Sequence, residues 1–561
     1  MTRYNWARRG DINAFFGLML DNVAVMIILF STITSTVPFA EQAKAGFIFF
    51  TPEFVLTRMI PGTALGVLLG DLVYTWMAFR LARQTGRNEV TAMPLGLDTP
   101  STFGMAFLVL MPALQEGWRL HQEQDRAMLF AWHVGLLTLI FAGIFKLICA
   151  PFGNAIRALV PRAGLLGSLA AIALALIAFL PMLLDGIAGV PLVGMMSLLI
   201  ILITLVAHRH LPWKFPGALA AVLLGVAIFG LGRLLEQSLG IPVSPPLKSS
   251  GSASWQPLGF LAFTAQPEGW WSEVFTFALG KLPVALPFAL ATIVGGIDCT
   301  ESAAAAGDDY DTRAILATEG AASFFAGLLG GVIQTTPYIG HPAYKKMGGR
   351  AAYTLATALF VGAVGYFGGF QLLFDWLPTA AMFPILVFVG LEITAQSFHA
   401  TPVKHYPALA FAMVPALAYL ALVVVKNLFG PTLPTGEPAL LLLQTLRILA
   451  NGFLITGLLW AAALVMILDG RMRAAAAYLL VAALLTFFGI IHSPLGDEMI
   501  DLPWNVMARV DVAFTAAIRY QTPYHWSLTY VLMALLLVGL GNAPAAATEA
   551  PPEEEERASA V

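Results

Sequence analysis

Long apolar runs recur along almost the whole chain, and they limit its fold more than any other feature. An α-helix needs about 20 apolar residues to cross the hydrocarbon core of a membrane. Only 11% of the 561 residues are charged, against roughly 25% in soluble domains. We therefore expect an all-α polytopic membrane protein and exclude an ordinary soluble enzyme. The full spans are predicted at 14–35, 55–79, 128–150, 163–184, 189–207, 216–235, 276–305, 314–333, 351–375, 379–398, 407–425, 443–468, 473–492 and 525–541.

Two further segments, 89–113 and 331–349, are apolar but are interrupted by Pro, Gly, Thr and Asp. If both cross the membrane, most Lys and Arg residues, including Lys146, Lys345 and Lys346, lie on the side of the N-terminus. Positive charges are enriched on the cytoplasmic side of membrane proteins. We therefore expect an integral protein of a bacterial-type inner or plasma membrane, with both termini in the cytoplasm.

Composition divides the chain into five parts. Seven segments precede a stretch rich in Ser, Pro and Trp, and an odd number of crossings inverts the second half relative to the first. The end of the chain is acidic and of low complexity, which is typical of disorder. The expected parts are a first repeat at 1–236, an external loop at 237–272, a second repeat at 273–492, a polar loop with a C-terminal membrane helix at 493–541, and a disordered tail at 542–561.

The two interrupted segments resemble each other. One contains L-G-L-D-T-P-S-T at 95–102 and the other I-Q-T-T-P-Y-I-G at 333–340. Thr is a good N-cap and Pro is favoured in the first turn of a helix, so Thr99-Pro100 and Thr336-Pro337 are predicted to begin half-helices within the membrane. Paired broken helices in two inverted halves indicate a transporter site. The residues expected to line this site are Asp98, Thr99, Gln334, Thr335, Thr336, Tyr338, Gly340 and His341.

Acidic residues inside apolar spans are costly and usually functional. Asp298 and Glu301 are three residues apart and share one helix face. Two neighbouring carboxylates in a low dielectric do not both ionise easily, so one is expected to hold a proton. Asp21 occupies the matching place in the first half. These three residues are predicted to couple transport to protons, and Asp298 and Glu301 also to bind the solute.

Other patterns give no site. Residues 307–311 (G-D-D-Y-D) lack the full ligand spacing of a calcium loop, so a solvated turn is expected there. His133, His208 and His210 have no metal-ligand partners at useful spacing, and we expect neither a metal nor a cofactor. The two cysteines exclude a disulfide scaffold, and a net charge of −3 gives no indication of a nucleic-acid partner.

Three runs resemble the xanthine/uracil permease family of nucleobase–cation symporters, in particular its guanine/hypoxanthine branch. They are I-D-C-T-E-S-A-A-A-A-G-D-D-Y at 297–310, L-A-T-E-G-A-A-S-F-F-A-G-L-L-G-G-V-I-Q-T-T-P-Y-I-G at 316–340, and A-M-P-L-G-L-D-T at 92–99. The resemblance covers about 11–425. It implies a 7+7 inverted repeat, a core of segments 1–4 and 8–11 that holds the substrate, and a gate of segments 5–7 and 12–14. It also implies an elevator-like motion of the core against the gate. The helices beyond 440 extend past the pattern of the family.

The resemblance places Asp298 on an acid of the guanine/hypoxanthine branch and Asp98 where that branch has Asn. The acid that follows the second half-helix start of the branch is replaced here by Gly340, with His341 next. The leading hypothesis is a secondary transporter, coupled to protons or sodium, for a small polar solute, with nucleobases as the first choice. The alternative is an inorganic-anion or carboxylate exchanger on the same fold. A third hypothesis is an intramembrane enzyme that uses the Asp298/Glu301 pair. The protein could also form a homodimer.

Overall fold

The computed structural model describes most of the chain. The residues described are 4–34, 49–153, 162–207, 209, 211–212, 215, 217–239, 263–264, 266–338, 340–370, 378–429, 437–494, 502–505 and 523–541. The acidic tail, most of the expected external loop and most of the polar loop after 494 lie outside them.

Helices dominate both halves, with short 3₁₀ or π stretches labelled η. The first half contains α1 (Gly10–Thr34), α3 (Pro52–Phe54), η2 (Val55–Met59), α4 (Ile60–Thr85), β1 (Leu95–Leu97), α5 (Thr99–Gly104), η3 (Met105–Leu110), α6 (Met111–His121), α7 (Gln124–Cys149), η4 (Ala150–Phe152), α9 (Arg162–Ile172), η5 (Ala173–Phe179), η6 (Met182–Ile187), α10 (Pro191–Ile201), η7 (Leu202–Val206) and α11 (Gly217–Leu239). The second half contains α12 (Trp270–Gly280), α13 (Leu282–Ala305), α14 (Thr312–Leu328), β2 (Thr335–Pro337), α15 (His341–Lys346), α16 (Ala352–Tyr366), α18 (Thr379–His399), η10 (Val403–His405), α19 (Tyr406–Ala412), α20 (Val414–Phe429), α21 (Glu437–Ala450), α22 (Phe453–Leu468), α23 (Met472–Phe487) and α26 (Pro523–Leu540).

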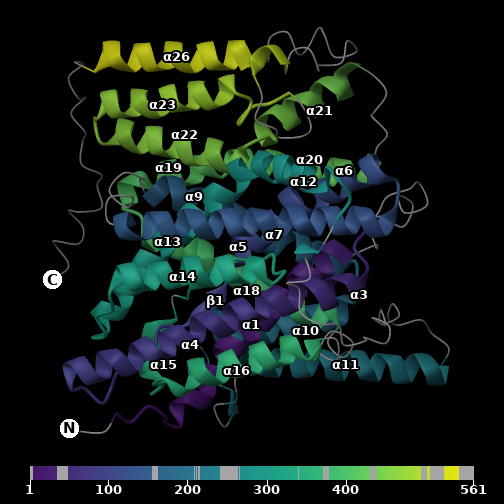
Figure 1. Cartoon of the computed structure of the whole chain (residues 1–561), viewed down its shortest axis with the longest axis vertical. Coiled ribbons are helices and arrows are strands. Elements are labelled where there is room, and N and C mark those ends of the chain that lie inside the picture. Colours follow the sequence, from purple (N-terminus) through teal and green to yellow (C-terminus); the bar gives the residue numbers. More distant parts are fainter. Residues whose placement is uncertain are drawn as a thin grey trace, which may run out of the picture.

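The predicted all-α polytopic membrane fold is confirmed. Among the described residues, eight helices are long and apolar enough to cross a membrane, and the bent pair α21–α22 adds a ninth. Figure 1 shows the long helices stacked side by side across the molecule. Several predicted spans are not continuous helices; for example, the span at 407–425 is divided into α19 and α20 at Met413. The span at 276–305 is split into α12 and α13 before Pro283, and the span at 443–468 bends by 68° between α21 and α22.

From α1 in the first half and from α13 in the second, the two halves share an order of elements, which is two long helices, a strand followed by a helix, and a further helix. These are α1, α4, β1–α5 and α7 in the first half, and α13, α14, β2–α15 and α16 in the second. Strands β1 and β2 pair with each other in antiparallel register, Gly96 opposite Thr336. The matching segments therefore meet with opposite chain direction, as an inverted repeat requires.

The interrupted segments confirm the predicted strand and half-helix only in part. Helix α5 begins at Thr99 as predicted, although Asp98 is its N-cap and accepts a hydrogen bond from the Ser101 N–H at 2.8 Å. In the second segment the prediction is wrong, because Thr336 and Pro337 belong to β2. The pairing continues to Tyr338, whose N–H donates to the Pro94 carbonyl. Since the ladder keeps these residues extended, the short helix α15 begins only at His341.

Small residues allow the helices around the strands to approach each other at backbone distance. A Cβ added to Gly62 of α4 would lie 2.2 Å from the Gly331 nitrogen, and one added to Gly143 of α7 would lie 2.7 Å from the Phe324 nitrogen. Such contacts are typical of helix packing in membranes. Helices α1, α4, α5, α7, α13, α14, α15 and α16 pack with the strands into one group, the strand group. Elements α9, η5, α10, α11, α18, α19, α20 and α22 pack into a second, the flanking group.

The C-terminal helices α22, α23 and α26 form layers at one end of the long axis (Figure 1). A polar and aromatic cluster holds them together. The Trp460 indole N–H donates to the Tyr530 hydroxyl at 2.7 Å, and Nε2 of His492 lies 2.7 Å from the same oxygen. The Trp526 ring stacks on His492. The extra helices are therefore packed onto the repeat and extend it away from the strands.

Candidate functional site: a central cavity

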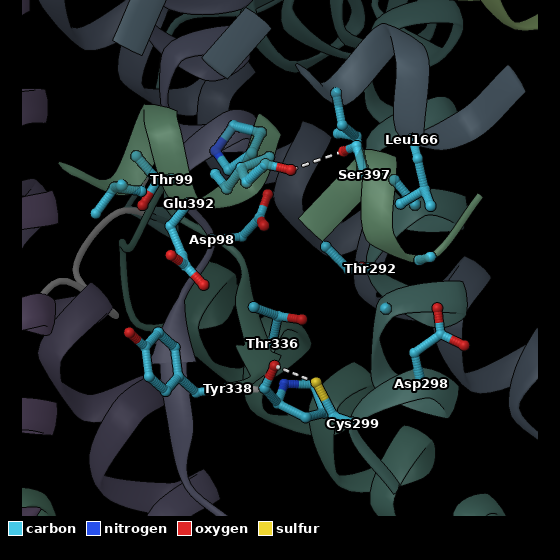
Figure 2. Close-up of a pocket in the computed structure, with 18 of the residues that line it drawn as sticks. Asp98, Thr99, Leu166, Thr292, Asp298, Cys299, Thr336, Tyr338, Glu392 and Ser397 are labelled. Carbon is cyan, nitrogen blue, oxygen red and sulfur yellow. Dashed lines mark hydrogen bonds between the residues drawn. The ribbon is translucent and has the colours of Figure 1, made fainter. Parts of the chain in front are cut away.

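A cavity of about 650 Å³ lies between the strand group and the flanking group. Its walls come from α1, β1, α5, α13 and β2 on one side and from α9 and α18 on the other. Figure 2 shows side chains from both groups around this space, with Thr336 and Tyr338 near Cys299, and with Glu392 and Ser397 from α18. The strands thus place the interrupted segments directly at the cavity.

Five carboxylates line the cavity: Asp21 on α1, Asp98 before α5, Asp298 and Glu301 on α13, and Glu392 on α18. No Lys, Arg or His occurs among the described lining residues. A cleft lined by charges of one sign concentrates counter-ions. The lining therefore favours cations, protons and solutes that offer hydrogen-bond donors.

Hydroxyl and thiol groups complete the polar part of the lining. They belong to Thr99, Thr292, Cys299, Ser302, Thr336, Tyr338 and Ser397. The Cys299 thiol donates a weak hydrogen bond to the Pro337 carbonyl at 3.4 Å, and the Ser397 hydroxyl donates to the Ile393 carbonyl at 2.7 Å within its own helix. Apolar side chains of the flanking group, such as Leu166 and Phe388, cover the opposite wall. The cavity is thus polar on the strand side and mainly apolar on the flanking side, apart from Glu392 and Ser397.

Side chains behind the strands satisfy their outer backbone groups, as is required where no water is available. In β1, the Leu95 N–H donates to Asp71 Oδ1 and the Leu97 N–H donates to Asn22 Oδ1, both at 3.0 Å. In β2, Lys146 Nζ donates to the Thr335 carbonyl at 3.0 Å. The short sheet is therefore fixed from both sides.

Seven of the eleven residues predicted for the site line the cavity, which are Asp21, Asp98, Thr99, Asp298, Glu301, Thr336 and Tyr338. Asp298 and Glu301 share one face of α13, as predicted. Gly96 pairs with Thr336, and Thr99 is three residues further on. The Cα atoms of Thr99 and Thr336 therefore lie within about 17 Å of each other.

The other four predicted residues are not among the lining residues. The Gln334 side chain is buried near Ser101, away from the cavity. Thr335 points behind the strand, where Ser323 lies. A Cβ added to Gly340 would meet the rings of Tyr338 and Tyr344 rather than open space. The fourth, His341, starts α15 and is fully buried beside Asp308. The longer β ladder explains the errors at Gly340 and His341, because it moves the start of α15 away from the cavity.

A buried ion pair joins α7 and α14, and no pattern in the sequence indicated it. Lys146, expected near the cytoplasmic face, is fully buried on α7, and its Nζ lies 2.7 Å from Glu319 Oε1 on α14. Both side chains are 0% exposed. Glu392, which the sequence did not assign to the site, lines the cavity from the flanking group. Neither contact follows from spacing along the chain, because the partners lie on helices far apart in sequence.

The loop between α13 and α14 also differs from its predicted solvated turn. Asp308 is fully buried and accepts the Thr91 N–H at 3.0 Å. Its carboxylate lies 2.6 Å from Lys345 Nζ and 3.3 Å from His341 Nε2. Burial alone would favour the protonated acid, but the hydrogen bonds from His341 and Lys345 hold the pKa of Asp308 below its usual range. The loop thus joins the two interrupted segments at one end of the strand group.

Comparisons with known proteins assign no family. No protein-family model and no curated protein matches the chain. The transmembrane domain of the cyanobacterium bicarbonate transporter BicA matches at 16% identity and a TM-score of 0.44, over 75% of this chain and 97% of that one. SLC26A9 matches at 10% identity and a TM-score of 0.41, over 67% of this chain and 65% of that one. The murine anion transporter Slc26a9, in the inward-facing state, matches at 13% identity and a TM-score of 0.39. This match covers 67% of this chain and 68% of that one. Likeness at this level transfers no substrate.

Proposed function

We propose that the protein is a secondary active transporter whose central cavity binds a small polar solute. The observation that carries this proposal is the pairing of two interrupted segments, one from each inverted half, at a cavity between two helix groups. Sites of this kind are typical of transporters. In this proposal the strand group is the core, segments 1–4 and 8–11, and the flanking group belongs to the gate, segments 5–7 and 12–14. Movement of core against gate would expose the cavity to each side in turn.

The carboxylates support coupling to protons or sodium. Asp298 and Glu301 stand one helical turn apart at the cavity, and Asp21 lies beside β1. A Cβ added to Gly96 would lie 3.6 Å from Asp21 Oδ2 and 3.7 Å from the Tyr338 ring. Ionisable groups at such positions in membrane proteins commonly mark ion pathways. We assign Asp298, Glu301 and Asp21 to ion coupling, and Asp98, Thr99, Thr336 and Tyr338 to contact with the solute.

Two solute classes remain, and a different observation favours each. The acidic and hydroxyl lining suits a neutral solute rich in N–H donors, such as a nucleobase, which agrees with the resemblance at 297–310 and 316–340. The names of the solved neighbours agree with the second class, an inorganic anion or a carboxylate. An anion in this cavity must enter with cations that neutralise the carboxylates. Anion transport would therefore depend strictly on the coupling ion.

Uptake into liposomes containing the purified full chain tests the proposal and separates the classes. The panel contains hypoxanthine, guanine, uracil, bicarbonate, sulfate and succinate, each with and without an inward proton or sodium gradient. Gradient-driven accumulation of a purine or pyrimidine supports the first class, and accumulation of one of the anions supports the second. If the folded protein accumulates none of these solutes above its external concentration under any gradient, secondary active transport is ruled out for this panel.

A further inference from the structure

The buried pair Lys146–Glu319 lies directly behind the wall of the cavity. Lys146 Nζ bonds the Thr335 carbonyl, and the next residue along β2, Thr336, lines the cavity. Thr335 stands opposite Leu97 in the sheet, and Asp98 follows Leu97. The ammonium group is therefore one residue layer from the acidic lining.

Glu319 reaches the same wall from the other side. A Cβ added to Gly296 of α13 would lie 3.1 Å from Glu319 Oε2, and the preceding residue, Gly295, lines the cavity. The two charges therefore border the cavity together, Lys146 behind β2 and Glu319 behind α13. Both side chains of the pair are 0% exposed.

Stability alone does not explain this arrangement. A buried ion pair is often no better than well-packed apolar side chains, because removing two charges from water is costly. The first half carries no such pair at its strand among the described residues, where Asp71 bonds the Leu95 N–H directly. The second half places a cation where a single polar side chain would satisfy the strand.

We propose that Lys146 sets the electrostatic potential of the solute cavity and so determines which solute charges it accepts, with Glu319 moderating its effect. The proposal rests on the proposed function, since it concerns the same cavity. With Lys146 charged, the cavity repels electron-rich or anionic groups beside Asp98 less strongly than the five carboxylates alone would. Lys146 influences the solute through its electrostatic field from behind β2. It therefore determines selectivity without touching the solute.

A charged thiol reagent can measure this potential without any knowledge of the solute. Gly295 offers the reporter position, because it lines the cavity and a Cβ added there has no atom within 4 Å. The parent protein carries Gly295→Cys together with Cys149→Ser and Cys299→Ser, which removes both native thiols. The measurement is the ratio of reaction rates with a cationic and an anionic methanethiosulfonate of similar size.

Removing one charge at a time should move this ratio in opposite directions. Glu319→Gln leaves Lys146 without its partner, so the cationic-to-anionic ratio should fall about tenfold. Lys146→Met should raise the ratio, because the negative partner remains. Ser323→Ala is the matched control: Ser323 bonds Thr335 at 3.1 Å without carrying a charge. It disturbs the same strand and should leave the ratio unchanged.

Each outcome decides the proposal. An unchanged ratio in folded Glu319→Gln, or shifts of both single variants in the same direction, overturns it. If one single variant does not fold, the double variant Lys146→Met/Glu319→Gln must have a ratio near that of the parent while the remaining single variant differs. If only the double variant folds, the pair is a structural ion pair and the proposal is wrong. Transport is not measured, so failure here leaves the proposed function to its own test.

Discussion

Asp298 is the residue on which ion coupling can be tested most directly. It presents a carboxylate to the cavity from α13, one turn from Glu301. Asp298→Asn keeps the size and polarity of the side chain but can neither ionise nor carry a proton. Gradient-driven accumulation of the transported solute should therefore be lost, while thermal unfolding of the purified protein stays close to wild type. Glu273→Gln, on an exposed acid of α12, is the control, and uptake by Asp298→Asn with the wild-type rate and pH dependence would remove Asp298 from the mechanism.

Asp308 should instead govern stability. It is fully buried, and its pKa is lowered because the hydrogen bonds from His341 and Lys345 outweigh the effect of burial. A lowered pKa in the folded state adds stability above the unfolded value near 4, and this stability is lost as pH falls through the folded value. Asp308→Asn should cost about 3 kcal/mol at pH 7. Because this stability is lost only below about pH 4, unfolding followed from pH 7 down to pH 3 should show a constant difference above pH 4 that begins to narrow below it.

The exposed neighbour Asp309 provides the control for this prediction. Asp309→Asn should change the free energy of unfolding by less than about 0.5 kcal/mol. A difference between Asp308→Asn and wild type that stays constant over the whole pH range would show that the charge of Asp308 is not responsible.

Single residues differ in how well sequence predicts them. Asp298 and Asp98 could be identified because an acid within an apolar span or beside a break in one is unusual. Lys146 could not, because it lies in the last turn of α7, where a lysine normally extends towards the membrane surface. Its partner Glu319 belongs to another half of the chain. Only the packing of α7 on α14 shows that this lysine turns inward.

The start of α5 combines two roles in Asp98, which caps the helix and lines the cavity. Two substitutions separate them. Asp98→Ala removes the cap and should lower the free energy of unfolding by about 1 kcal/mol. Asp98→Ser keeps a capping oxygen and should leave stability nearly unchanged, while binding in the cavity is altered in both variants because both lack the carboxylate. Thermal unfolding and uptake of the same solute measure the two effects, and equal destabilisation by both substitutions would contradict the capping role.

The two interrupted segments show why local patterns predict one half-helix and not the other. A Thr-Pro dipeptide occurs at the break in both, and Pro100 lies in the first turn of α5 as expected. In the second segment the same dipeptide remains extended, since Thr336 and Pro337 pair with Gly96 and Leu95. This pairing joins residues from different halves of the chain. Local propensity therefore placed the break correctly but could not place the start of α15.

Hydropathy predicted the membrane fold of the whole molecule well, because about 20 apolar residues per crossing is a strong physical requirement. The internal symmetry could also be predicted, since the interrupted segments recur in the same order. Bends within a span were harder to predict. Gly452, with a positive φ of 69°, lies at the bend between α21 and α22, inside what hydropathy treats as one continuous run. A single glycine changes mean hydropathy very little, although it redirects the chain.

The orientation of the whole molecule yields the last prediction. Figure 1 shows α15 towards one side and α6 towards the other, and the Trp270 ring stacks on His121 at the end of α6. Glu268 and Lys346, both exposed, should therefore lie on opposite membrane faces. In a protein without its native thiols, Glu268→Cys should react with an impermeant maleimide from outside the cell. Lys346→Cys should react only from the cytoplasm, because Lys345, Lys346 and Arg87 gather on its side. Labelling of both from one face would contradict the inverted repeat, whereas exchanged faces would reverse only the orientation.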